Sequence, residues 1–297
     1  MKHIRLSVIF MKIAIIDIGS NSVRLALTAG GKTLYKRVET ARLSEGLGIS
    51  GKLTETAIIR TAKAVDGFKK QALRDGAEKV YVFATEAVRS ASNGAEFVKH
   101  TKERYGIDVD VISGETEADI GLLGALGSDD GGIIDLGGAS CEVTVRSGGS
   151  VIYCKSVGIG AVRILENCNR DRLKIENYIS EKLPLYGDFD ASSYNMYGIS
   201  GTAITLSAVK NKLEVYDPKI THGTVLTTQE VGALADRFLS LPVEEIKKIA
   251  GMVVWRADII GGATLFLYRL LQKLHISEIT VSENDNLEGY LIYKGNK

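Results

Sequence analysis

The chain has 297 residues, of which 45% are hydrophobic and 25% are charged, a composition that is typical of a folded globular protein and excludes a disordered or fibrous one. Lys and Arg number 37 against 36 Asp and Glu, so the chain lacks the basic field of a general nucleic-acid-binding protein, and no nucleic-acid partner is expected. The 32 Gly against 3 Pro indicate tight turns or close approach of the backbone to a ligand.

The cysteines and the first residues favour a cytoplasmic protein. Cys141, Cys154 and Cys168 fit neither a disulfide framework nor a zinc-ligand spacing, which indicates a reducing compartment. The most apolar early stretch, residues 6–16, is shorter than the roughly 20 residues of a membrane span, so no membrane partner is expected. We interpret residues 1–10 as a dispensable N-terminal extension, because Met11 leads directly into a strand pattern.

The sequence repeats itself once, because residues 13–36 align without gaps on residues 131–154. The identical pairs are Ile15/Ile133, Ile16/Ile134, Asp17/Asp135, Gly19/Gly137, Ser22/Ser140, Gly30/Gly148, Gly31/Gly149 and Tyr35/Tyr153. Each copy predicts a strand, a turn of small residues opened by Asp, a second strand, a Gly-Gly hairpin turn and a third strand. Duplication therefore predicts two similar domains.

After each repeat, helices and strands alternate, which predicts an α/β sheet in each half. In the first half the helices are expected at residues 54–74, 93–105 with Asn93 as cap, and 113–126 with Ser113 as cap, and the strands at 79–84 and 108–112. In the second half the helices are expected near Arg163 and at 172–183, 201–210, 228–240, 243–249 and 254–274, and the strands at 194–199 and 278–281. The predicted domains are 11–126 and 127–297, with the last helix and strand free to pack back on the first domain.

The two repeated turns, residues 17–22 and 135–140, offer what a phosphate group needs. Each supplies backbone N–H groups and hydroxyls in one tight loop, and glycine lets the backbone approach the phosphoryl oxygens. Facing each other, they would form a cleft in which Asp17 and Asp135 hold a divalent cation through water. The alternative is a pair of hairpin turns whose Asp and Ser side chains cap their own backbones. Their occurrence in register favours the phosphate interpretation.

Three further positions are ambiguous when each is taken alone. Residues 198–202 form a strand-to-helix turn in which Ser200 or Gly201 lies near a helix N-terminus that would favour an anion, although many α/β connections look similar. Glu117 lies in the first turns of a predicted helix, where acidic residues commonly complement the helix dipole. Arg89 is either a solvated side chain or a bidentate phosphate ligand.

Taken together, these segments resemble the exopolyphosphatase / guanosine pentaphosphate phosphohydrolase (Ppx/GppA) family of the actin-like ATPase superfamily. The segments that carry the resemblance are residues 17–25, 42–46, 84–89, 112–118, 135–142, 200–202 and 256–262. The resemblance spans residues 11–293 and implies two ribonuclease-H-like domains, each a mixed β-sheet flanked by helices, around a central cleft. It also implies hydrolysis of a terminal phosphoanhydride bond with Mg²⁺.

The resemblance implies that Glu117 is the catalytic base and that Asp135 and Glu142 act on metal and water, and we add Asp17 from its repeated turn. The expected phosphate-binding residues are Ser20, Asn21, Ser22, Arg89, Gly137, Gly138, Ser140, Gly201 and Thr202. The chain departs from the family pattern at Ala139, where a third glycine is usual, and at Cys141, where threonine is usual. Residues 285–289 read Asp-Asn-Leu-Glu-Gly, in place of the family's Gly-Leu-Arg-Glu-Gly.

The expected function is Mg²⁺-dependent release of terminal orthophosphate from inorganic polyphosphate by attack of water. One alternative is the same chemistry on guanosine pentaphosphate, and another is a catalytically weak sensor that binds phosphate or a nucleotide. The sequence leaves open whether the protein is a homodimer.

Overall fold

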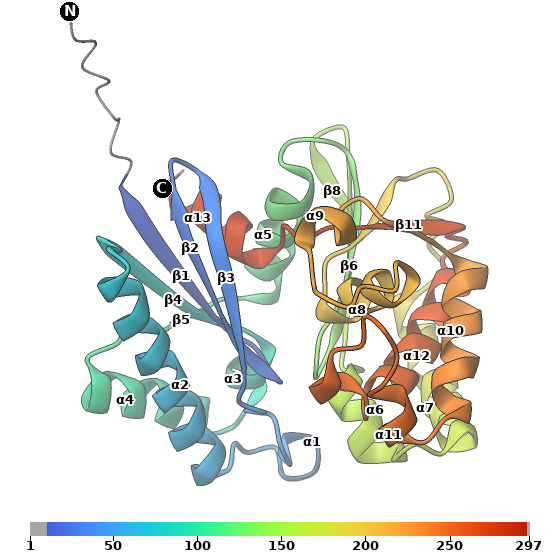
Figure 1. Cartoon of the computed structure of the whole chain (residues 1–297), viewed down its shortest axis with the longest axis horizontal. Helices are drawn as coiled ribbons and strands as arrows, with labels where there is room; N and C mark the ends of the chain where they lie inside the picture. The colour runs from blue at the N-terminus through green and yellow to red at the C-terminus, as the bar shows by residue number, and fades with distance from the viewer. Residues whose placement is uncertain (1–10, 296–297) are drawn as a thin grey trace, which may run out of the picture.

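The computed structural model describes residues 11–295, so the prediction for residues 1–10 lies outside the described residues. The first sheet has the order β3-β2-β1-β4-β5, and its strands are β1 (Lys12–Ile18), β2 (Ser22–Ala29), β3 (Lys32–Thr40), β4 (Lys79–Ala84) and β5 (Asp110–Val111). The second has the order β10-β11-β9-β6-β7-β8, and its strands are β6 (Gly131–Leu136), β7 (Cys141–Ser147), β8 (Ser150–Val157), β9 (Met196–Gly198), β10 (Val225–Thr227) and β11 (Glu278–Val281). Figure 1 shows the two sheets side by side.

The two sheets are built in the same way, as the repeat predicts. In each, three antiparallel strands are followed by a fourth strand that pairs in parallel with the first. The hairpin turns Gly30-Gly31 and Gly148-Gly149 have positive φ at both residues, between 57° and 74°, a conformation that glycine adopts without steric strain. The fold is therefore a duplicated α/β unit with two mixed sheets.

Helices separate the two sheets and cover their outer faces. Those of the first half are α1 (Leu47–Ser50), α2 (Glu55–Arg74), α3 (Glu86–Ser90), α4 (Gly94–Tyr105) and α5 (Gly114–Leu126). Those of the second half are α6 (Ala161–Cys168), α7 (Arg172–Lys182), α8 (Gly201–Lys210), α9 (Pro218–Thr221), α10 (Thr228–Ser240), α11 (Val243–Ile246), α12 (Ile260–Lys273) and α13 (Asn286–Gly295), with the 3₁₀ helices η1 (Leu183–Tyr186) and η2 (Val254–Arg256). None of the helices within residues 11–295 combines the length and the apolar character that a membrane crossing requires.

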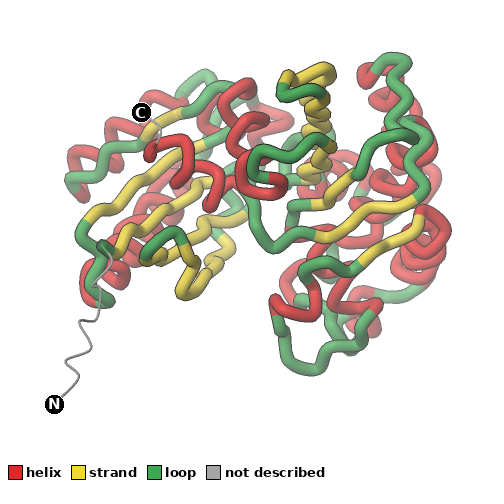
Figure 2. The backbone as a smooth tube through the Cα atoms, turned by 90° about the horizontal axis from the view of Figure 1, so that it is seen from above, coloured by secondary structure: helices red, strands yellow, loops and turns green. Residues whose placement is uncertain are grey.

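Two equivalent positions of the repeat show how the layers are packed. Ile16 and Ile134 face the outer helices, and each belongs to the large apolar core of its own half. Their neighbours Ile15 and Ile133 point to the opposite faces, where Ile15 packs with residues of α5 and α13 and Ile133 packs with residues of α5. Side chains alternate across a strand, so one short apolar run supplies both faces of each sheet. Figure 1 shows α5 and α13 between the two groups of strands, and Figure 2 shows helices, drawn in red, between the two groups of yellow strands.

Glycines allow α5 and α13 to cross at close range. A Cβ atom on Gly289 would lie 1.7 Å from the carbonyl oxygen of Ile120, and one on Gly124 would lie 2.0 Å from the carbonyl oxygen of Asp285. Neither position therefore accommodates a side chain without moving a backbone. The crossing ties α13, which follows the last strand of the second sheet, to the helix that carries Glu117 (Figure 1). The last strand itself, β11, lies within the second sheet.

Several predicted elements differ in detail. Asn93 precedes α4 but does not cap it with its side chain, because its Oδ1 accepts from the backbone N–H of Leu53 at 2.8 Å. The helix predicted at 254–274 consists of η2 and α12, and this break places Trp255 and Arg256 on the wall of the central cleft. The strands predicted at 108–112 and 194–199 are the shorter β5 and β9. The predicted cap Ser113 is confirmed, because its side chain accepts from the backbone N–H of Thr116, and Thr54 caps α2 in the same way through the N–H of Ala57.

Candidate functional site

A cleft of about 450 Å³ opens between the two sheets. Its wall contains the turn after β1, the turn after β6, the N-terminus of α8 and the start of α5. Both repeated turns therefore face one cavity, as expected if the two halves bind one ligand between them.

The two repeated turns almost touch across this cleft. A Cβ atom on Gly138 would lie 3.2 Å from the Cβ atoms of both Ser20 and Asn21. The second turn is held in place by α6, because the carbonyl oxygens of Gly137 and Gly138 accept from backbone N–H groups at the start of that helix. A side chain at Gly138 would therefore be tightly packed, although its φ, which is not positive, would allow one. The absence of a side chain at Gly138 lets the two donor-rich turns lie this close together.

Most of the predicted site residues line the cleft, but two do not. Those on its wall are Asp17, Ser20, Asn21, Ser22, Glu117, Asp135, Gly137, Gly138, Ser140, Glu142 and Gly201. Thr202 is fully buried in α8, and its hydroxyl has no hydrogen-bond partner among the described residues. Arg89 lies behind the wall on α3, where it pairs with carboxylates. The structure therefore brings together both turns and all four predicted acidic residues.

Glu117 reaches the cleft from the first turn of α5. Ser113 accepts from the N–H of Thr116 and starts the helix at this point. Glu117 itself is only 8% exposed. Arg89 donates to Glu117 Oε2 at 3.0 Å and to the carbonyl oxygen of Ile112 at 2.8 Å. Burial raises the pKa of Glu117 to about 7, although Arg89 opposes this shift. A carboxylate with a pKa near neutrality is suited to accept a proton from water.

The other three carboxylates are buried close enough to repel one another. Burial raises the pKa of Asp135 to about 6 and that of Glu142 to about 8, and neighbouring carboxylates add to both shifts. Burial also raises the pKa of Asp17. Ser156 donates to Glu142 at 2.5 Å. This concentration of acidic groups favours binding of protons or of a cation at neutral pH.

The buried carboxylates are better suited to a Mg²⁺ ion that also binds a substrate phosphate than to one held by protein side chains alone. No three His, Cys, Asp or Glu side chains of residues 11–295 cluster closely enough to hold a metal ion by themselves. However, Oδ1 of Asp17 is buried without a hydrogen-bond partner among the described residues, and it is a free acceptor on the cleft wall. Mg²⁺ commonly uses one or two carboxylates together with water and substrate phosphates. The donor set is therefore compatible with this cation.

Arg24 is a cleft residue that the sequence analysis did not assign. Its Nε donates to Asp17 Oδ2 at 2.9 Å, and its Nη1 donates to Asp285 Oδ2 at 2.6 Å. Asp17 and Arg24 are directly opposite each other in the β1–β2 register. The predicted hairpin carried this signal, because both residues flank the same turn. Asp285 had no such signal, since it is distant in sequence.

Ala139, the first departure in the second turn, does not disturb the cleft. It is not among the non-glycine residues with positive φ in the described chain, and it is 2% exposed. Its methyl group therefore packs in the interior, and the residue does not lie on the cleft wall. The turn keeps Gly137, Gly138 and Ser140 on that wall.

Two mixed α/β sheets of the same construction around a central cleft define the two-domain actin-like fold. Within this class, the chain belongs to the Ppx/GppA phosphatase family, whose model matches residues 24–295. The crystal structure of the Aquifex aeolicus member of the Ppx/GppA family superposes with a TM-score of 0.79 and 28% identity, covering 97% of this chain and 98% of that one. The family membership places the chain among phosphoanhydride hydrolases.

Curated relatives with different activities match almost the whole chain. Exopolyphosphatase 2 of Mycobacterium tuberculosis is 27% identical over 94% of this chain and 97% of its own length. The bifunctional 3-dehydroquinate synthase/phosphatase of Fusobacterium nucleatum is 32% identical over 94% of this chain, which spans 46% of that protein. The guanosine-5'-triphosphate,3'-diphosphate pyrophosphatase of Photobacterium profundum is 29% identical over 95% of this chain, which spans 58% of that protein.

Proposed function

We propose that this protein is a Mg²⁺-dependent exopolyphosphatase that releases terminal orthophosphate from inorganic polyphosphate. The observation that carries the proposal is that the buried carboxylate of Glu117 and the donor-rich turns of both sheets line one cleft. The relation to exopolyphosphatase 2 of Mycobacterium tuberculosis, which covers 97% of that protein, supports the choice of polyphosphate.

In the proposed reaction, a water oxygen attacks the terminal phosphorus atom. The bond between that phosphorus and the bridging oxygen breaks, and the shortened chain leaves with the bond's electron pair. Glu117 orients the water and accepts its proton, while Arg89 holds the carboxylate in position through their 3.0 Å contact. Backbone N–H groups and hydroxyls of the two turns donate to the terminal phosphoryl oxygens. Asn21, Gly138 and Ser140 are among the residues that supply these donors.

Asp17, Asp135 and Glu142 would hold Mg²⁺ in this cleft. When bound, the cation supplies positive charge that neutralises phosphate oxygens and the surrounding carboxylates. The raised pKa values of Asp135 and Glu142 support this assignment, because a cation would relieve the repulsion that contributes to them.

Guanosine pentaphosphate is the second candidate substrate, favoured by an apolar part of the cleft wall. Val253, Trp255 and Ile259 line the cleft beside the N-terminus of α8. An aromatic ring next to a phosphate site can stack on a nucleobase, whereas polyphosphate has no apolar group to bury. If a base binds there, Trp255→Ala would raise KM for the guanosine substrate and leave KM for polyphosphate unchanged.

Phosphate release from each substrate, with and without Mg²⁺, tests the proposal. We expect Mg²⁺-dependent release from polyphosphate, and Glu117→Gln should lower kcat by about 10² to 10⁴, as is usual for loss of a general base. Glu115→Gln is the matched control, because Glu115 is exposed in the same first helical turn and does not line the cleft. Binding of polyphosphate without release of phosphate would contradict the enzyme proposal and favour a sensor that binds phosphate. Full activity of Glu117→Gln would refute the assigned base alone.

A further inference from the structure

One carboxylate in the cleft wall forms ion pairs with cationic side chains that could otherwise bind a phosphate. The cationic side chains on the described wall belong to Arg24, Lys36, Arg37 and Arg256. Asp285 pairs directly with Arg24 at 2.6 Å and lies 3.8 Å from the ammonium of Lys36, whose closer carboxylate partner is Glu288 at 2.9 Å. This aspartate comes from a distant part of the chain, because it follows β11 and directly precedes α13.

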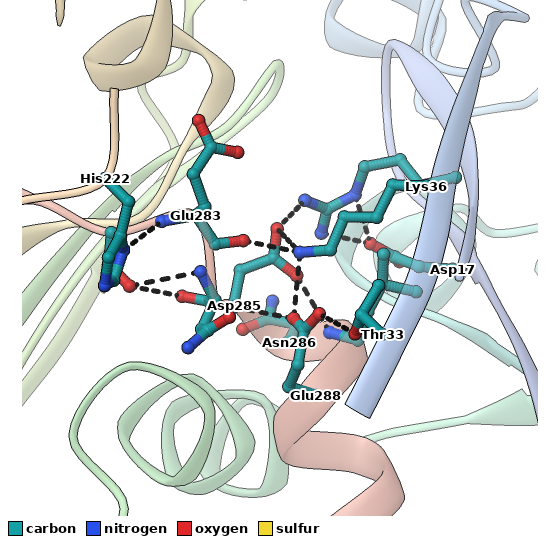
Figure 3. Close-up of polar contacts among 12 residues, drawn as sticks. Asp17, Thr33, Lys36, His222, Glu283, Asp285, Asn286 and Glu288 are labelled. Atoms are coloured by element: carbon teal, nitrogen blue, oxygen red, sulfur yellow. Dashed lines mark hydrogen bonds and ion pairs between the residues drawn. The ribbon is translucent and has the colours of Figure 1, made fainter. Parts of the chain in front are cut away.

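Asp285 is held in this position by its own helix. Its Oδ1 accepts from the backbone N–H of Leu287 at 2.9 Å, which is an N-cap contact to α13. Its Oδ2 accepts from Arg24 at 2.6 Å, and the residue is 3% exposed. Figure 3 shows Asp285 and Lys36 pointing toward each other from opposite sides of the site. The carboxylate is therefore fixed beside the cleft.

The charge of Arg24 is compensated twice before any ligand binds. Arg24 donates to the carboxylate of Asp17 through Nε and to the carboxylate of Asp285 through Nη1. Burial alone would raise the pKa of Asp285, but Arg24 and Lys36 together hold it below its usual value. Asp285 is therefore an anion at neutral pH. A phosphate oxygen makes the same charge-assisted hydrogen bonds with guanidinium and ammonium groups as a carboxylate oxygen does.

We propose that Asp285 is an internal anion that competes with substrate phosphate for Arg24 and Lys36, and so sets the affinity of the cleft for polyanions. The inference rests on the proposed function only in assuming that the cleft receives phosphate groups. A polyanion that approaches this wall is repelled by the negative charge of Asp285, and the cationic side chains it would bind already have a carboxylate partner. Both effects weaken its binding, and the first is strongest in a partly desolvated cleft.

Asp285→Asn separates the charge from the structural role. Asparagine caps a helix about as well as aspartate, so the contact to Leu287 is kept while the negative charge is lost. Binding of tripolyphosphate, measured by calorimetry in the Glu117→Gln background, should become tighter by roughly tenfold or more, the scale expected for one charge at short range. This measurement needs no turnover, so its result is independent of whether the proposed hydrolysis occurs. In the active enzyme, KM should fall while kcat stays within about twofold.

Glu283→Gln is the matched control for net charge. Glu283 also lines the cleft, but its carboxylate accepts from Tyr216 and Thr221 and makes no ion pair with Arg24 or Lys36. We expect this variant to change the Kd for tripolyphosphate by less than about twofold, because it leaves both ion pairs intact. An equal effect of Glu283→Gln and Asp285→Asn would overturn direct competition in favour of a general charge effect.

A double-mutant cycle with Arg24→Gln tests the named partner. If Asp285 acts through Arg24, most of the gain from Asp285→Asn disappears when Arg24 is already replaced. An undiminished gain would overturn the role of Arg24. If Asp285→Asn lowers the Tm strongly, Asp285→Ser, which also supplies a capping oxygen, serves as the second variant. Unchanged or weaker tripolyphosphate binding by folded Asp285→Asn and Asp285→Ser would show that Asp285 is only a structural link.

Discussion

The guanidinium of Arg89 donates to the carboxylate of Glu117 at 3.0 Å from behind the cleft wall. A second N–H of Arg89 donates to Glu86 at 2.8 Å, so two carboxylates fix the plane of the guanidinium. Glu117 is in turn held at one oxygen, which leaves the other available to the cleft. This arrangement makes Arg89 a positioning residue for Glu117 as well as a source of positive charge.

Replacement of Arg89 by Gln should shift the pH dependence of hydrolysis. Arg89 lowers the pKa of Glu117 against the effect of burial, so its loss should raise that pKa above the present value of about 7. Glu117 would then lose its proton only at higher pH, and the acidic limb of the kcat/KM profile should move upward. The measurement is the pH profile of phosphate release. An acidic limb that stays in place would mean that another group controls it.

The metal-free protein should become less stable as pH rises through the neutral range. Burial raises the pKa values of Asp135, Glu117 and Glu142 to about 6, 7 and 8, above their ordinary values of 3.8 and 4.5. The folded state therefore binds these protons more tightly than the unfolded state does. Their contribution to the free energy of unfolding is complete below the ordinary values and is lost as pH rises toward about 8.

Thermal unfolding between about pH 5 and pH 8 checks this expectation. The Tm should fall with rising pH, and Glu142→Gln should make the fall smaller because one of the groups no longer titrates. Added Mg²⁺ should raise the Tm more at the upper end, where the carboxylates are free of protons. A Tm that rises with pH in the absence of metal would contradict the burial of these carboxylates.

Gly289→Ala should destabilise the protein through the crossing of α5 and α13. The new methyl group would lie 1.7 Å from the carbonyl oxygen of Ile120 and 3.0 Å from the N atom of Gly124. Overpacking of this kind costs about 1 to 3 kcal/mol or more, because backbone has to move. Because α5 carries Glu117, kcat should fall as well. Gly295→Ala in the same helix meets nothing within 4 Å and should leave both the free energy of unfolding and kcat nearly unchanged.

Gly201→Ala should alter substrate binding with little loss of stability. Its Cβ atom would lie 1.9 Å from Nη2 of Arg256, and the end of a long side chain can move where a backbone cannot. The displaced guanidinium lines the cleft and also stacks on Trp255 at 4.6 Å. We expect KM to rise and the Tm to change by no more than a few degrees, corresponding to about 1 kcal/mol or less. A large fall in Tm would indicate that Arg256 cannot be displaced.

The sequence predicted the parts of the fold that have local causes. The Asp-led turns, the Gly-Gly hairpins and the cap Ser113 each depend on a few neighbouring residues, and the structure confirms these local features. The family and the two-sheet fold followed from the order of such motifs. The helix α13 was missed because its sequence, residues 286–295, contains two glycines and no clear apolar stripe. Its position depends on α5, which is distant in sequence.

The site residues that belong to local sequence motifs could be predicted from the sequence. Asp17 and Asp135 reach one cleft, as the paired turns indicated, and Glu117 and Glu142, expected there only from the family resemblance, line the same cleft. Arg24 could have been found from its register opposite Asp17. The ion pair of Asp285 with Arg24 could not, because 261 positions separate the two residues and only the packed fold brings them together.

The narrow gap at Gly138 also bears on the spacing of the two halves. A Cβ atom added at Gly138 would lie only 3.2 Å from the Cβ atoms of Ser20 and Asn21, so little space separates the two turns here. A larger side chain at Gly138 would act as a wedge that fixes the minimum spacing between the halves at a greater value.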